Sequence, residues 1–125
     1  MQTTQDRRAA FKALHKKGGA FLMPNPFDAG SARILNGMQF DALATSSAGY
    51  AWTKGVRDTE GLISRDNALA HAQEIIAVTS VPINGDLENG FGDSPEDVAE
   101  TVKGAIEIGL AGCSIEDQTT DPGKT

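Results

Sequence analysis

Apolar and polar positions follow helical and strand-like patterns in alternation along the whole chain. Segments with apolar residues at helical spacing and a capping residue at the start predict helices, and they cover residues 5–17, 28–36, 64–79 and 94–109. Short apolar runs predict buried strands, at residues 20–23, 42–45, 81–86 and 111–115. A polar loop rich in Gly and Ser is expected from Ser46 to about Ile63.

The predicted elements follow one another in the order of a parallel α/β protein. After the first helix, four strands alternate with three helices, and this order predicts a parallel sheet with right-handed crossovers. A repeat of roughly one β/α unit per thirty residues fits a doubly wound sheet or part of a (β/α)8 barrel. A chain of 125 residues suits a single domain.

Composition and charge narrow the function classes. The chain has 17 acidic and 11 basic residues, a formal net charge of -6, which argues against a nucleic-acid surface. One basic cluster on the first helix is interpreted as a solvated helix face; it consists of Arg7, Arg8, Lys12, Lys16 and Lys17. The single cysteine excludes an internal disulfide and fits a reducing cytoplasm. No apolar run is long enough for a membrane span, and no secretory leader is visible.

Acidic side chains gather where the third and fourth predicted strands end. Asp86 and Glu88 follow the third strand, and Glu116 ends the fourth. Because strand side chains alternate, Asp86 and Glu88 share a face if the strand geometry persists to Glu88, and Ser114 shares a face with Glu116. The carboxyl ends of parallel strands meet at one edge of the sheet. The three carboxylates are therefore expected to converge there.

Converging carboxylates repel one another, so they either take up protons or bind a cation. Oxygen ligands without His or Cys favour Mg²⁺, with Mn²⁺ as the alternative. The other interpretation is that Asp86 and Glu88 are ordinary strand-end acids that cap the following loop. Spacing alone leaves both interpretations open. Neither Gly-rich stretch has the spacing of a phosphate-binding loop.

Five motifs in a fixed order carry a resemblance that covers nearly the whole chain. They are Pro24–Ala32, Thr45–Tyr50, Gly55–Asp58, Asp86–Gly92 and Ser114–Asp117. Together they resemble the isocitrate lyase/phosphoenolpyruvate mutase superfamily, in its carboxyvinyl-carboxyphosphonate phosphorylmutase-like branch. The resemblance implies the N-terminal half of a (β/α)8 TIM barrel, with about four β/α units and an N-terminal helix. Residues 1–125 would then be one partial barrel domain, truncated after the fourth strand.

The resemblance also implies a chemistry and a set of site residues. It implies a Mg²⁺-dependent lyase or mutase that forms or breaks a C–C or P–C bond next to the carboxylate of a small 2-oxo or 2-hydroxy acid. The acids that match the family's metal site are Asp86, Glu88 and Glu116, the last two often acting through water. The residues that match its catalytic acids are Asp58, near the reacting group, and Glu116. The segment that matches its carboxylate-binding turn is Ser46, Ser47 and Ala48.

Departures from the family pattern keep a second hypothesis open. The Cys-containing segment that serves isocitrate and methylisocitrate lyases as acid/base is absent from residues 118–125, and only Lys124 could stand in for the gating-loop lysine of phosphonomutases. Cys113 is interpreted as a buried structural thiol on the outward face of its strand. The alternative is a non-catalytic half-barrel that assembles only with another copy or a partner. The full-length form is expected to be a cytoplasmic homo-oligomer.

A few further side chains are interpreted in structural terms. His15 and His71 are expected at exposed helix positions. Asp28 is expected to cap a helix and not to act as a catalyst. Tyr50 and Trp52 either cover the site or pack within the long loop.

Overall fold

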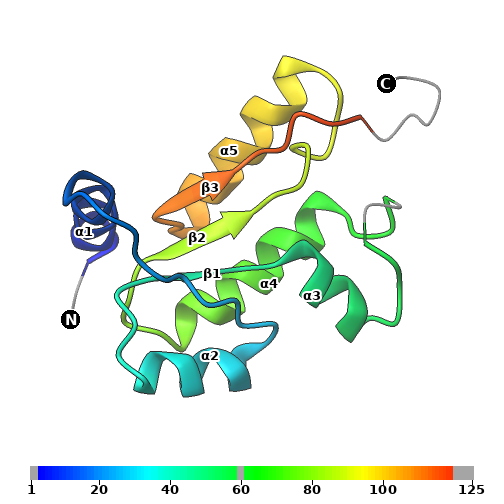
Figure 1. Cartoon of the computed structure of the whole chain (residues 1–125). Helices are drawn as coiled ribbons and strands as arrows, with labels where there is room; N and C mark the ends of the chain where they lie inside the picture. The colour runs from blue at the N-terminus through cyan, green and yellow to red at the C-terminus, as the bar shows by residue number, and fades with distance from the viewer. Residues whose placement is uncertain (1–2, 59–60, 120–125) are drawn as a thin grey trace.

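The computed structural model describes residues 3–58 and 61–119, and it is an α/β fold (Figure 1). The elements within these ranges are, in chain order, α1 (Thr4–Lys16), α2 (Ala29–Gly37), β1 (Leu43–Ala44), α3 (Ser47–Thr53), α4 (Arg65–Ala77), β2 (Ile83–Asp86), α5 (Pro95–Ile108) and β3 (Gly112–Ser114).

The strands form one parallel sheet in the order β1-β2-β3, as the alternation of elements predicted. In the register of the sheet, Asn84 of β2 pairs with Ala44 of β1 on one side and with Gly112 of β3 on the other. The ladder continues past the strand ends, because the Glu116 N–H donates to the Glu88 carbonyl at 2.7 Å. The carboxyl ends of all three strands therefore lie at one edge of the sheet.

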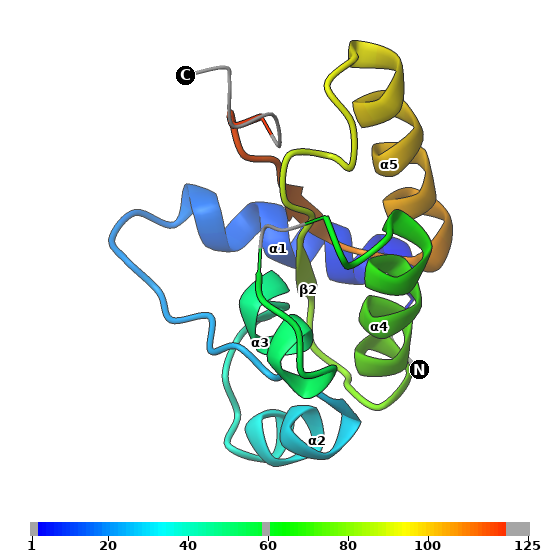
Figure 2. The same cartoon turned by 90° about the vertical axis from the view of Figure 1, so that its right-hand side faces the viewer.

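Helices α4 and α5 cover one face of the sheet, and α1 lies at the amino ends of the strands (Figures 1 and 2). A Cβ at Gly85 would stand 2.6 Å from a Leu110 methyl, so Gly85 faces the helices. A Cβ at Gly112 would stand 2.5 Å from a Phe11 ring carbon. Because the Leu110 and Phe11 side chains pack so closely against the sheet, a residue with a Cβ would not fit at either position. Asn84 and Asp86 point away from α4 and α5, as strand alternation predicted.

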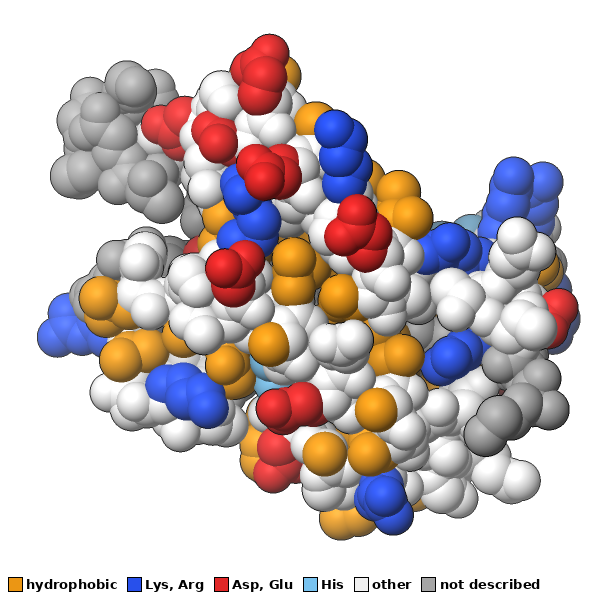
Figure 3. Space-filling model, turned by 180° about the vertical axis from the view of Figure 1, so that it is seen from behind, with side chains coloured by type: hydrophobic (Ala, Val, Ile, Leu, Met, Phe, Trp, Pro, Cys, Tyr) orange, Lys and Arg blue, Asp and Glu red, His pale blue; other side chains and the backbone are white. Residues whose placement is uncertain are grey.

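An apolar layer fills the space between the sheet and these two helices. Its buried members are Ala32, Leu43, Ala72, Ile75, Ile76, Ile83, Leu87, Ala105 and Leu110. Helix α4 contributes residues at spacings of three and four, the periodicity that predicted the helix. On the outer face of the molecule, acidic and basic side chains are interspersed (Figure 3), and Arg65 of α4 forms an ion pair with Glu100 of α5 at 3.3 Å.

Helix starts agree with the sequence. Asp28, Ser64 and Ser94 each cap a helix by accepting a backbone N–H from the first turn, and the expected role of Asp28 is confirmed. Pro95 occupies the first position of α5, where its missing N–H is harmless. Gly109 ends α5 in a left-handed conformation with φ 93°. Among the described residues, no helix has both the length and the apolar character that crossing a bilayer requires.

Two predicted elements are wrong. Residues 20–23 do not form a strand, and Leu22 is 75% exposed. The contact with β1 comes after this segment, where the Ala44 N–H donates to the Pro24 carbonyl at 3.2 Å and the Asn25 side chain donates to the Ala44 carbonyl at 3.0 Å. The prolines at 24 and 26 remove the donors that a ladder needs. The loop expected from Ser46 to Ile63 begins instead with α3, because Ser46 caps a first turn and Gly55 (φ 71°) follows its end.

The basic cluster on α1 is only partly a solvated face. Lys12, Lys16 and Lys17 are exposed, whereas Arg7 and Arg8 are half-buried. The Arg8 guanidinium donates to the carbonyls of Ile106 at 2.7 Å and Leu110 at 3.0 Å. These carbonyls lie at the C-terminal end of α5, where a cation complements the helix dipole. Arg8 therefore fastens α1 to α5.

Candidate metal and substrate site

The acidic edge is built around Asp86, the last residue of β2. Its backbone N–H donates to the Thr45 hydroxyl at 2.9 Å, and its Oδ2 accepts the Ser47 N–H at 2.9 Å. The end of β1 and the first turn of α3 thus fix the Asp86 carboxylate. Thr45 was not anticipated as a site residue, although its place directly after β1, beside the Ser-rich turn, was the available signal.

The Glu88 side chain lies at the same edge of the sheet, although its backbone does not have the expected strand conformation. The condition that strand geometry persists to Glu88 is wrong, because β2 ends at Asp86 and Glu88 has φ 48°. Phe91 is also left-handed at φ 61°, and a non-glycine residue in this region costs about 1–3 kcal/mol. The Glu88 side chain nevertheless lines a small pocket together with Asp86.

Electrostatics show that four carboxylates lie near one another. Glu88 is only 6% exposed, and burial is the main cause that raises the pKa of its carboxyl group. The charges of Asp58, Asp86 and Glu116 raise this pKa further. Like charges around a nearly buried acid favour either a proton or a cation. These four residues are called the acidic mouth below.

Asp58 has an unsatisfied oxygen in this mouth. The Ser47 hydroxyl lies 3.5 Å from Oδ2 of Asp58, the limit for a hydrogen bond. Oδ1 of Asp58 is buried and has no hydrogen-bond partner among the described residues. A buried carboxylate oxygen without a partner calls for a water molecule or an ion.

The carboxylate oxygens of the acidic mouth are suitable ligands for a hard divalent cation, but they are not close enough together to coordinate one ion directly. Among the described residues, no group of three His, Cys, Asp or Glu side chains could hold a metal ion directly. Shared direct coordination by Asp86, Glu88 and Glu116 is therefore not seen. Mg²⁺ keeps several of its waters in proteins, so one direct carboxylate with water-mediated neighbours remains compatible with the oxygen-only donor set.

The predicted carboxylate-binding turn is the start of α3. Ser46 caps the helix by accepting the Gly49 N–H at 3.1 Å, and the Ser47 N–H is engaged by Asp86. Of the first-turn donors, the Ala48 N–H is the one that remains for a ligand among the contacts of the described residues. The turn adjoins the acidic mouth through the Ser47 hydroxyl and N–H.

His71 of α4 lies beside the acidic mouth, and its predicted exposure is wrong. It was expected to be exposed, but it is only 5% exposed. Its ring stacks on Tyr50 of α3 with centroids 4.1 Å apart, and Nε2 lies 2.9 Å from the Phe27 carbonyl. Burial lowers the pKa of His71. Tyr50 therefore packs α3 onto α4, while Trp52 is 70% exposed. The signal that could have found His71 is its spacing of four residues from Ile75.

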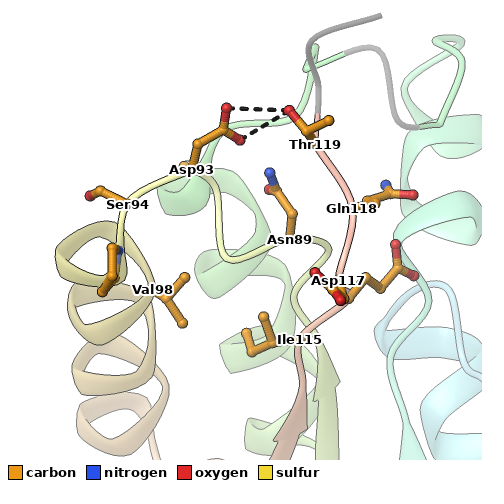
Figure 4. A pocket seen from close by; sticks show the side chains of 11 residues that line it. Asn89, Asp93, Ser94, Val98, Ile115, Asp117, Gln118 and Thr119 are labelled. Carbon is orange, nitrogen blue, oxygen red and sulfur yellow. Dashed lines mark hydrogen bonds between the residues drawn. The ribbon is translucent and has the colours of Figure 1, made fainter. Parts of the chain in front are cut away.

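Two spaces adjoin the mouth. A cavity of about 10 Å³ lies between Asp86, Glu88 and His71, enough for about one water molecule. An open groove of about 960 Å³ runs between the start of α5 and residues 115–119 (Figure 4). Asn89 and Glu116 belong to its lining, and the Thr119 hydroxyl donates to Asp93 at 3.3 Å across it. The groove is large enough for a small acid.

Cys113 lies in β3 on the face of the sheet that packs against α5. Cys113 pairs in register with Gly85 and faces α5, which confirms its outward direction. It is half-buried and not fully buried, and burial raises its thiol pKa. His15 is exposed, as expected. Lys124 lies outside the described residues.

Parallel strands, helices on one face and acids at the carboxyl edge define a class: α/β proteins with a strand-end site of the TIM-barrel kind. The family description "Phosphoenolpyruvate phosphomutase" matches residues 11–125, and the chain belongs to the phosphoenolpyruvate mutase/isocitrate lyase superfamily. The expected resemblance is thus confirmed, and the sheet matches part of the TIM barrels of that superfamily.

Several relatives are similar over most of the chain. The 2-methylisocitrate lyase of Escherichia coli strain K12 is 34% identical over 110 residues, covering 87% of this chain and 37% of the relative. The chloroplastic carboxyvinyl-carboxyphosphonate phosphorylmutase of Arabidopsis thaliana is 34% identical, covering 86% and 32%. The crystal structure of a candidate lyase/mutase from Burkholderia cenocepacia J2315 has a TM-score of 0.90 at 50% identity, covering 97% and 42%. The chain spans less than half the length of each.

Proposed function

We propose that the protein containing this chain is a Mg²⁺-dependent enzyme of the lyase or mutase type. It forms or breaks a C–C or P–C bond next to the carboxylate of a small 2-oxo or 2-hydroxy acid. The observation that carries this proposal is the environment of Glu88, a nearly buried acid whose pKa is raised by burial and by three neighbouring acids. The relatives named as lyases and a phosphorylmutase support the reaction class.

Asp86 is proposed as the direct ligand of the cation, since both its N–H and its Oδ2 are fixed by β1 and α3. Glu88 and Glu116 are proposed to hold water around it, with Mn²⁺ as a possible substitute for Mg²⁺. When bound, the cation supplies Lewis-acid stabilisation of the negative charge that develops beside a carboxylate. It would also relieve the repulsion among the acids of the mouth.

The substrate carboxylate is proposed to bind at the turn of Ser46, Ser47 and Ala48. The Ala48 N–H and the hydroxyls of this turn can donate to it, since hydroxyls and backbone N–H groups recognise carboxylates. Asp58 and Glu116 are proposed as catalytic residues. Asp58 lies close to the Ser47 hydroxyl and has one oxygen without a partner, so it is placed to accept or return a proton near the reacting carbon.

The proposed context is a (β/α)8 barrel to which residues 1–125 contribute one partial domain, with the N-terminal helix α1 and the parallel sheet of β1, β2 and β3. A homo-oligomer is proposed for the full-length form. A second candidate function is a non-catalytic half-barrel that assembles with another copy or a partner. It is favoured by β3, which has a paired neighbour on one side only in the described sheet, because such an edge can accept another strand.

The test is an activity assay on the complete gene product that contains this sequence. Oxaloacetate, phosphonopyruvate and 2-methylisocitrate are offered with Mg²⁺ and with a chelator, and products are identified by NMR. We expect Mg²⁺-dependent turnover of oxaloacetate or phosphonopyruvate, because residues 118–125 lack the Cys-containing segment of the methylisocitrate lyases. Asp86→Asn should abolish turnover. Turnover that persists unchanged in the chelator, or no turnover with any of the three acids, would refute the enzymatic proposal.

The half-barrel alternative is separated by light scattering on the same protein. A defined dimer without turnover and without heat on titration with Mg²⁺ would support it. Turnover, or Mg²⁺ binding that Asp86→Asn removes, would exclude it.

A further inference from the structure

A buried threonine far from the acidic mouth in sequence holds the loop that carries Glu88. Thr101 lies in the middle of α5 and is fully buried. Its hydroxyl donates to the Gly90 carbonyl at 2.5 Å and accepts the Nε–H of Arg65 at 2.7 Å. The Arg65 charge polarises the hydroxyl and strengthens its donation to Gly90. One side chain thus joins α4, α5 and the loop between β2 and α5.

That loop has an unusual backbone. Glu88, Gly90 and Phe91 all have positive φ, at 48°, 86° and 61°, so the loop requires external contacts to hold this conformation. Beyond β2 it is held on the strand side by the bond from the Glu116 N–H to the Glu88 carbonyl. On the helix side it is held by Thr101. The two attachments lie on either side of Asn89.

We infer that Thr101 is a positioning residue that acts through its hydroxyl: oriented by Arg65, it fixes the Glu88 loop in the left-handed conformation that directs Glu88 into the acidic mouth. Thr101 touches neither substrate nor cation. The consequence for cation binding rests on the proposed function, whereas the consequence for the loop does not. The competing explanation is that Thr101 only fills space with its methyl group.

Two substitutions at this position separate the two explanations. Thr101→Val keeps the shape and removes the hydroxyl, while Thr101→Ser keeps the hydroxyl and removes the methyl group. Mn²⁺ affinity is measured by calorimetry, and backbone hydrogen exchange is followed at residues 88–92. We expect Thr101→Val to accelerate exchange in the loop and to weaken Mn²⁺ binding by no more than about tenfold, the lower end of what losing a direct partner of a metal ligand costs, because Thr101 acts on Glu88 only through the loop. Thr101→Ser should resemble the wild-type protein in both measurements.

The matched control is Thr79→Val. The Thr79 hydroxyl donates to the Ile75 carbonyl at 3.0 Å, and it lies after the C-terminal end of α4, near the amino end of β2. This variant should leave Mn²⁺ affinity and loop exchange unchanged. The inference is overturned if Thr101→Val matches the wild-type protein in both readouts, or if Thr101→Ser is impaired as strongly as Thr101→Val.

A second variant covers the case in which Thr101→Val does not fold. Arg65→Lys retains the positive charge beside Glu100 but lacks the planar Nε–H donor. Faster exchange at residues 88–92 in a folded Arg65→Lys protein supports the inference, and unchanged exchange overturns it. If the wild-type protein binds no Mn²⁺, the proposed function fails, while the exchange measurements still decide the role of Thr101.

Discussion

The apolar layer behind the sheet and the acidic mouth at its edge each contain buried side chains, yet these side chains contribute to stability in opposite directions. Leu43, Ile75 and Ile83 are fully buried or nearly so in the layer, and burying each such side chain stabilises the fold by about 1.5–3 kcal/mol. The mouth instead buries Glu88 among like charges. Burial alone therefore does not distinguish a structural residue from a functional one.

Backbone strain is also concentrated beside the acidic mouth. Two of the three non-glycine residues with positive φ in the described chain, Glu88 and Phe91, lie in one loop beside it. Repulsion and strain in one place destabilise the folded state, and they persist only because the surrounding packing is strong. Such concentrations are typical of sites retained for function.

The largest effect is expected in the apolar layer. Ile75→Ala should reduce the free energy of unfolding by about 2–5 kcal/mol, because it removes a fully buried side chain and leaves a cavity. The measurement is urea denaturation followed by circular dichroism. The matched control is Ile106→Ala on α5, where the side chain is 56% exposed; its effect should stay below about 1 kcal/mol. Equal losses for the two variants would contradict the assignment of the layer.

The layer was also the more predictable of the two regions. Residues 72, 75 and 76 follow a helical period, and the caps Asp28, Ser64 and Ser94 have the expected local chemistry. These features depend on neighbours within a few residues, so a single sequence contains them. The direction of Asp86 followed in the same way, from alternation along β2.

The remaining errors involve contacts between residues distant in sequence. His71 is buried because Tyr50, on a helix that was expected to be a loop, stacks on it. Glu88 faces the mouth although the strand has ended, because Thr101 and Glu116 fix its loop. No local pattern specifies such contacts.

A second prediction compares two glycines with similar backbones. Gly90 has φ 86°, and a Cβ there would stand 2.9 Å from Cγ2 of Val98, whereas Gly55 has φ 71° and open space around it. Gly55→Ala should cost about 1 kcal/mol from the left-handed backbone alone. Gly90→Ala should cost about 2–3 kcal/mol, because strain and overpacking add, and it should also weaken Mn²⁺ binding. Equal effects would show that α5 does not constrain the loop.

A third prediction compares two helix caps of equal chemistry. Ser46 accepts the Gly49 N–H at 3.1 Å at the start of α3, and Ser64 accepts the Asn67 N–H at 3.2 Å at the start of α4. Each Ser→Ala change should cost about 1 kcal/mol in urea denaturation. Only Ser46→Ala should also weaken the binding of pyruvate, measured by calorimetry in the presence of Mg²⁺. Loss of pyruvate binding in both variants would mean that the turn at Ser46 has no special role.

The smallest predicted change has the opposite sign, because Glu88→Gln should stabilise the protein while weakening cation binding. In the folded state the pKa of Glu88 lies above its ordinary value. Between the ordinary and the raised pKa, the folded protein therefore binds more protons than the unfolded chain, and the stability of the wild-type protein falls as pH rises through that window. Glu88→Gln lacks this decline. The difference in unfolding free energy between the two proteins should be smallest at acidic pH and reach a plateau above the raised pKa.

The open groove beside the mouth admits solvent, so screening should limit this plateau to about 1 kcal/mol. The measurement is a series of urea titrations from pH 4 to pH 8 without divalent ions. Aspartates with lowered pKa, such as Asp28 and Asp97, lose their stabilising effect at lower pH, but both proteins share them and they cancel in the difference. Adding Mg²⁺ should then stabilise the wild-type protein more than Glu88→Gln. The prediction is contradicted if the difference in unfolding free energy stays constant with pH and Mg²⁺ stabilises both proteins equally. The charge of Glu88 would then not be repelled by its neighbours, and the acidic mouth would be a set of ordinary strand-end acids.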